Sequence, residues 1–149
     1  MYEAIMHVPL LISTPGQKGR KDVHAFTSSV DLLPTLAQIT DNPIPAWCEG
    51  QLLPEMGGTE TPSRSVFTVD AKNNASFAPL TRTSISLTKN PYRLTYYKYP
   101  GAGEQFEFYN FSEDPDELKD LYSSGPAIAL DMRAELLQKL SEVNSPYDG

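Results

Sequence analysis

Four polar residues of the sequence could bind a substrate: His7, Lys72, Asn73 and Asn74. Lys72, Asn73 and Asn74 follow an apolar segment, and in a complete enzyme they could reach a substrate across a cleft. Neighbouring asparagines also form turns, because their short side chains bond to nearby backbone groups. His7 precedes another apolar segment, where an imidazole can bind a ligand or hold a structural place at the entrance of a strand. Both interpretations stay open for each of the four residues.

Two further features carry charges that could do chemistry. Residues 17–22, with the sequence QKGRKD, contain three cations that could attract an anionic substrate. A solvated surface loop is the alternative, since exposed charges usually contribute little.

Asp31 could ligate a metal, but it stands immediately before a helical pattern with a proline in its first turn. Such a position is typical of a helix N-cap, and we predict that role for Asp31.

Length and charge limit the possible partners. The chain has 149 residues, enough for one domain, and a net charge of −7 from 12 basic and 19 acidic residues. This balance argues against nucleic acid and against an anionic membrane surface as partners. We expect no membrane span, because no apolar run approaches the roughly 18 residues required. We recognise no signal peptide at the N-terminus, and one cysteine excludes an internal disulfide.

The first half of the chain alternates apolar runs with polar loops. Residues Val8 to Ser13 (VPLLIS) are apolar on both faces, which predicts a strand buried in a parallel sheet. Such a strand needs neighbouring strands, so the run indicates that the chain begins within a larger sheet. Apolar residues at 32, 36 and 39 predict a helix with one apolar face. A second apolar strand is expected over residues 64–69.

The second half has the alternation of an antiparallel sheet. Residues 83–88, 92–99 and 106–111 alternate apolar and polar side chains and are predicted to form successive strands joined by hairpins. The segment Asp114-Pro115-Asp116-Glu117 predicts a short capped helix over 114–121.

A longer helix is predicted over residues 126–143, with Ser124 as its cap. Its apolar residues recur at the spacing of a helical stripe, which we expect to cover one face of the sheet: Met132, Leu136, Leu140 and Val143.

Four ordered segments resemble motifs of the sulfatases, a family within the alkaline phosphatase superfamily. Residues 2–16 resemble LYEEAxRVPLIISxPG, although His7 replaces the usual arginine, and residues 28–39 resemble SxxDLLPTLxxLxG. Residues 41–58 resemble the DGxSLLPLLxG linker, and residues 106–121 resemble LYDLENDPxExxNL. The resemblance implies an α+β chain: the tail of a large α/β domain over residues 1–80, then a small antiparallel subdomain with a final helix over 81–149.

The resemblance also implies a chemistry that this chain does not contain in full. Sulfatases use a formylglycine, made from cysteine in Cys-x-Pro-Ser-Arg or Cys-x-Ala-x-Arg, and a divalent cation, usually Ca²⁺. Cys48 is followed by EGQL, and two residues before Pro62, in the segment TPSR, stands Glu60. We therefore assign no catalytic residue and no metal ligand here. Ca²⁺ and formylglycine are implied for a full-length enzyme.

The predicted function is that of a C-terminal sulfatase fragment, which completes the fold and the substrate cleft and is inactive alone. Its expected partner is the remainder of the sulfatase chain, with self-association through Val8 to Ser13 as an alternative; the full-length enzyme would act on a sulfate ester. Two other functions stay open: a free-standing module that binds a sulfated glycan or a protein, and part of a phosphoester-cleaving relative. The sequence leaves substrate and compartment undetermined.

Overall fold

The computed structural model describes residues 2–71 and 78–147, which pack as two compact units. Unit 1 comprises Met1–Pro9 and Phe67–Gly149, and unit 2 comprises Leu10–Val66. The elements follow in the order α1 (Glu3–Met6), α2 (Leu32–Ile39), β1 (Val66–Ala71), β2 (Thr83–Lys89), β3 (Tyr92–Tyr99), β4 (Gly103–Asn110) and α3 (Ala127–Asn144). The boundary between these units does not coincide with the predicted domain boundary at residue 80. That predicted boundary refers to the large α/β domain of a complete sulfatase and stays a prediction.

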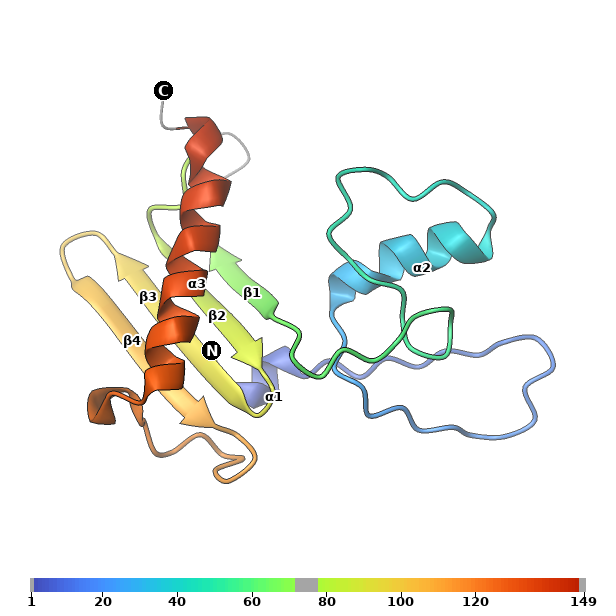
Figure 1. The fold of residues 1–149 in the computed structure, drawn as a ribbon, viewed down its shortest axis with the longest axis horizontal. Helices are drawn as coiled ribbons and strands as arrows, with labels where there is room; N and C mark the ends of the chain where they lie inside the picture. Colours follow the sequence, from blue (N-terminus) through green and yellow to red (C-terminus); the bar gives the residue numbers. More distant parts are fainter. Residues whose placement is uncertain (1, 72–77, 148–149) are drawn as a thin grey trace. The chain divides into compact units, whose positions relative to one another are not determined.

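Unit 1 is a four-stranded antiparallel sheet in the order β1-β2-β3-β4, with α3 across one face (Figure 1). In the central register Leu87 lies opposite Leu94, and Leu94 lies opposite Phe108. Side chains alternate between the two faces of a strand, so these three residues share the face beneath the helix. They form the hydrophobic core with Met132 and Leu136 of α3. The predicted strands and the α+β fold are confirmed.

The predicted stripe on α3 is confirmed along most of its length. Met132, Leu136 and Leu140 are buried, whereas Val143 is 44% exposed near the end of the helix. The predicted cap is wrong: Pro126 precedes the helix, and the hydroxyl of Ser124 donates to the carbonyl of Leu121 within a preceding 3₁₀ turn.

The helix predicted over residues 114–121 is also wrong. This segment forms turns and irregular backbone, and Glu117 has a φ of +51°, in the left-handed region that a helix excludes. The cause is the Glu117 side chain, which pairs with Arg93 of β3. Both side chains are nearly inaccessible, at 1% and 3% exposure. An interaction across the fold therefore overrides the local pattern of a helix start.

Unit 2 contains long irregular connections and α2, which begins directly after Asp31 and includes the apolar residues 32, 36 and 39, as predicted. The predicted strand over residues 8–13 is wrong, because residues 7–14 have neither helix nor strand. A strand requires a neighbour that accepts its backbone hydrogen bonds. The sheet formed by the described residues contains only β1 to β4, so it offers no neighbour to this run. Leu11, within the run, is 95% exposed.

In the part of the chain that the structure describes, no helix combines the length and the apolar character needed to cross a membrane.

Candidate functional site

The predicted substrate-binding residues fall in two places. Lys72, Asn73 and Asn74 lie outside the described residues, so their role stays a prediction. His7 belongs to unit 1, follows α1 and is exposed. The role of His7 also stays a prediction.

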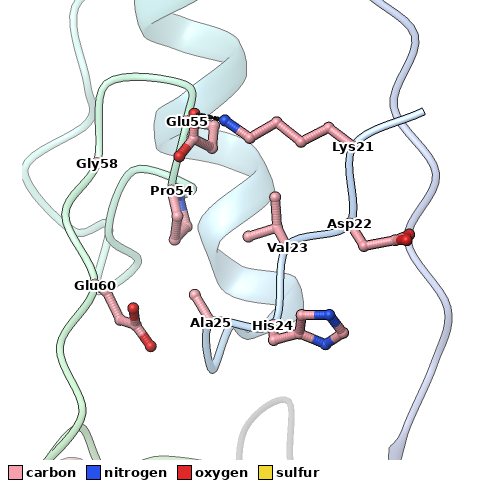
Figure 2. A pocket seen from close by; sticks show the side chains of 9 residues that line it. All are labelled: Lys21, Asp22, Val23, His24, Ala25, Pro54, Glu55, Gly58 and Glu60. Carbon is pink, nitrogen blue, oxygen red and sulfur yellow. Dashed lines mark hydrogen bonds and ion pairs between the residues drawn. The ribbon is translucent and has the colours of Figure 1, made fainter. Parts of the chain in front are cut away.

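Unit 2 contains an open cleft of about 300 Å³ (Figure 2). One wall is residues 21–25 and the other comes from residues 54–60, with Val23, Ala25 and Pro54 as its apolar part. Three carboxylates and one ammonium line it: Asp22, Glu55, Glu60 and Lys21. An excess of negative charge disfavours a sulfate group in this cleft.

Two of the three cations in residues 17–22 form ion pairs. Lys21 pairs with Glu55 across the cleft, and Arg20 pairs with Asp22 at 2.8 Å between Nε and Oδ1. These side chains are more than half exposed, so both pairs contribute little to stability. The arrangement supports a solvated surface loop and does not concentrate positive charge for an anionic substrate.

Asp31 is the most densely hydrogen-bonded acid of unit 2. Its Oδ1 accepts from Arg64 at 2.6 Å and from the backbone amide of Gln51 at 2.9 Å. Its Oδ2 accepts from Arg64 at 2.5 Å and from the amide of Ser28 at 2.8 Å. Burial raises the pKa of this carboxyl, but the four hydrogen bonds and the Arg64 charge outweigh burial, and the pKa lies below its usual range.

The role predicted for Asp31 is therefore only partly correct. Asp31 does precede α2, but its carboxylate makes no capping bond to that helix. Its four donors occupy the oxygens that a metal would require, so it is not a metal ligand. Sequence reasoning missed Arg64 as its partner, since the two residues stand 33 positions apart.

Unit 1 contains tyrosines that are held in the neutral state. Burial, together with a hydrogen bond to Glu104, raises the pKa of Tyr96 to about 12. Burial and the hydrogen bond to Glu107 raise the pKa of Tyr97 further still. A neutral phenol at physiological pH can donate a hydrogen bond but is a poor base or nucleophile. These tyrosines are part of the packing of the sheet.

The described residues contain no group of three or more acids, histidines or cysteines that could hold a metal. Cys48 is a half-buried free thiol outside the sequence motif for formylglycine.

The family model described as N-sulphoglucosamine sulphohydrolase, C-terminal, matches residues 1–145. The chain belongs to this family. Arylsulfatase K of Bos taurus is 31% identical over 98% of the chain and 27% of the relative, and arylsulfatase K of Homo sapiens is 30% identical over 91% and 26%. The chain therefore spans about a quarter of the length of these relatives. Its resemblance to the C-terminal portion of a sulfatase is confirmed.

Two solved structures are similar to this C-terminal sulfatase domain. A putative sulfatase from Bacteroides thetaiotaomicron VPI-5482 has a TM-score of 0.56 and 27% identity, and covers 76% of the chain and 24% of the other protein. BT4656, determined in complex with its substrate D-glucosamine-2-N,6-O-disulfate, has a TM-score of 0.51, 19% identity and coverages of 78% and 24%. At that identity BT4656 bears on the fold alone. Both match about a quarter of the larger protein.

Proposed function

We propose that this chain serves as the C-terminal part of a sulfuric ester hydrolase, in which it completes the fold and the substrate cleft. On its own the chain is inactive. The observation that carries the proposal is the apolar surface of residues 8–39. Large apolar side chains are exposed here in two groups, one along the irregular run and one on and beside α2: Val8, Leu10, Leu11, Ile12, Leu32, Leu33, Leu36 and Ile39.

A group of exposed large apolar side chains marks a place where another polypeptide packs. In α2, residues 32, 36 and 39 share one helical face, as in a helix that packs against a sheet. The remainder of the sulfatase chain is the partner that best fits this surface. Its parallel sheet would supply the neighbouring strands that the run Val8 to Ser13 lacks.

Inactivity of the chain alone follows from the chemistry of sulfate ester hydrolysis. Breaking the S–O bond develops negative charge, which a divalent cation and cationic side chains stabilise. The residues described here do not fit Ca²⁺, because no carboxylate cluster is present among them. Nor does the sequence around Cys48 permit conversion to formylglycine. Both groups are proposed for other parts of a full-length enzyme.

The proposed substrate of the complete enzyme is a sulfate ester, which the similarity to arylsulfatases supports. In that enzyme His7, Lys72, Asn73 and Asn74 are the residues of this chain proposed to contact substrate. The acidic cleft in Figure 2 is not proposed for that role, since its carboxylates would repel a sulfate group.

A second candidate is self-association through Val8 to Ser13, which the exposure of this apolar run favours. An unpaired strand-forming segment can pair with its counterpart in a second copy. The two candidates predict different solution behaviour, because a run already paired in a dimer would be protected from solvent in the chain alone.

The deciding experiment is to sequence the coding region immediately upstream of the Met1 codon. We expect an in-frame Cys-x-Pro-Ser-Arg or Cys-x-Ala-x-Arg motif preceded by paired aspartates. The purified 149-residue chain should then give no turnover of an aryl sulfate, whereas the longer product should hydrolyse it. A stop codon and ribosome-binding site upstream, or turnover by the short chain, would overturn the proposal.

A further inference from the structure

Unit 2 has almost no hydrophobic core of its own. Within residues 10–66, all of which the structure describes, the buried residues are Asp31, Pro34, Thr35 and Leu53. Two of the four are polar, and Leu53 is the one large aliphatic side chain among them. Burial of apolar surface is the usual source of stability and shape for a compact unit. Something other than a core must therefore fix the conformation of unit 2.

A polar network takes that place. Asp31 binds the backbone amide of Gln51, and Thr35, four residues later, binds the amide of Leu53 at 2.9 Å. Residues four apart share a helical face, and amides two apart point the same way along an extended chain. The two spacings match, so the start of α2 holds residues 51–53 at two points. Arg64 then fixes the carboxylate of Asp31 from the far end of unit 2.

The approach of the two segments is as close as the chain permits. A β-carbon added at Gly50 would lie 2.1 Å from the carbonyl oxygen of Val30, well inside van der Waals contact. Any larger residue at position 50 would push the segment away from the start of α2. Position 50 thus provides a way to disturb this contact without changing any charge.

We infer that Asp31, Thr35 and Arg64 form a polar clamp that holds α2 in the orientation in which its apolar face docks on the rest of the sulfatase. The inference rests on the proposed function. At roughly 100° per residue, Leu32, Leu36 and Ile39 lie about a quarter-turn around the helix from Asp31 and Thr35. The clamp fixes one side of α2 and leaves the apolar side exposed. Asp31 and Arg64 are positioning residues, and neither is assigned a chemical step.

Hydrogen exchange measured by mass spectrometry on the 149-residue chain tests the clamp. Asp31→Asn leaves Arg64, whose side chain is 11% exposed, without its charged partner. Exchange across residues 28–53 should rise by roughly two orders of magnitude, and exchange in α3 should not change. Gly50→Ala should produce the same local increase. Glu55→Gln, which removes the exposed ion pair with Lys21, is the matched control and should leave exchange unchanged.

A pH series separates a charge clamp from simple packing. The charged group that faces Asp31 is Arg64, and its other two donors are backbone amides. Because the Asp31 pKa is lowered on folding, its stabilisation is present above the ordinary value of 3.8 and is lost as the pH falls through the lower folded value. In the unaltered chain, the protection of residues 28–53 from exchange, corrected for the intrinsic exchange rate, should fall as Asp31 becomes protonated. In Asp31→Asn it should not show this fall.

Two results would overturn the clamp: equal exchange in Asp31→Asn and Glu55→Gln, or loss of protection in α3 together with unit 2. Neither result depends on the upstream coding sequence or on catalysis. A failure of the clamp can therefore be distinguished from a failure of the proposed function.

Discussion

Replacing Glu117 by alanine should destabilise unit 1 more than any change to a surface charge. Glu117 and Arg93 form a buried ion pair, and the guanidinium also lies 5.3 Å from the ring centroid of Phe111. Removing one partner of a buried ion pair costs about 3–5 kcal/mol. A domain of this size has a total stability of about 5–15 kcal/mol. The loss would therefore be a large share of the whole.

The assay is urea unfolding followed by circular dichroism, with thermal unfolding as a second measurement. At about 2–4 °C per kcal/mol, the melting temperature should fall by roughly 6–20 °C. Asp116→Ala is the matched control, because it removes one negative charge from an exposed position in the same loop. That control should change the free energy of unfolding by less than about 0.5 kcal/mol.

A double variant tests the reasoning from the other side. Arg93→Met combined with Glu117→Leu replaces the pair by apolar side chains of similar size, so both charges of the pair are removed together. It should lose less stability than Glu117→Ala alone. The reasoning would be refuted if the free energies of unfolding of Glu117→Ala and Asp116→Ala differed by less than about 1 kcal/mol, the error of such a comparison. It would also be refuted if the double variant were the least stable of the three.

Two further predictions concern the core of unit 1. Leu136→Ala removes a fully buried side chain between α3 and the sheet, and should lower the free energy of unfolding by about 2–5 kcal/mol. Leu130→Ala, on the exposed side of α3, should lower it by less than about 1 kcal/mol, roughly the value of one part-buried methylene. Both values come from the same urea titration. Tyr96 should ionise near pH 12 in an ultraviolet titration of the folded chain, and Tyr96→Phe should remove that step. Because its pKa is raised on folding, Tyr96 stabilises the fold fully below about pH 10, the pKa of an unperturbed tyrosine. That contribution is lost as the pH rises toward 12. Ionisation of Tyr96 near pH 10 would contradict this prediction.

The parts of the fold that sequence predicted well are those governed by periodicity. The strands β2, β3 and β4 alternate because one face of the sheet packs under α3, and Met132, Leu136 and Leu140 recur at helical spacing for the same reason. Helix α2 begins after Asp31 and includes the apolar residues 32, 36 and 39, as its pattern predicted. In each case the spacing of the apolar residues indicates which face of the element is buried.

The predictions that failed depended on partners distant in sequence. The acidic turn at residues 114–117 has the residues of a helix start, but Glu117 binds Arg93, 24 positions away. Asp31 stands directly before α2 as predicted, but its carboxylate binds Arg64 and makes no capping bond to the helix. The run Val8 to Ser13 has the composition of a buried strand and remains irregular among the described residues. Local pattern reports the preference of a segment, and tertiary contacts decide between preferences of similar energy.

The candidate site was the least predictable feature, for a physical reason. Substrate-binding residues are selected for contact with a ligand and leave no periodic pattern in the chain. Lys72, Asn73 and Asn74 were chosen only by residue type and position after a strand. The cleft in Figure 2 also has polar lining residues, but its acidic excess disfavours sulfate. Charge balance within a three-dimensional site, and not the presence of polar residues, distinguishes a binding site from a solvated loop.

The two units also differ in what holds them together, and this difference bears on their roles. Unit 1 buries a continuous apolar layer between the sheet and α3, so it can be stable without further partners. Unit 2 buries two polar and two apolar residues and leaves most of its large aliphatic side chains exposed, so its stability must depend on what covers them. A unit shaped by polar contacts and completed by docking suits a segment that joins a C-terminal subdomain to a larger sheet. On this argument, covering residues 10–39 should protect unit 2 from unfolding far more than unit 1.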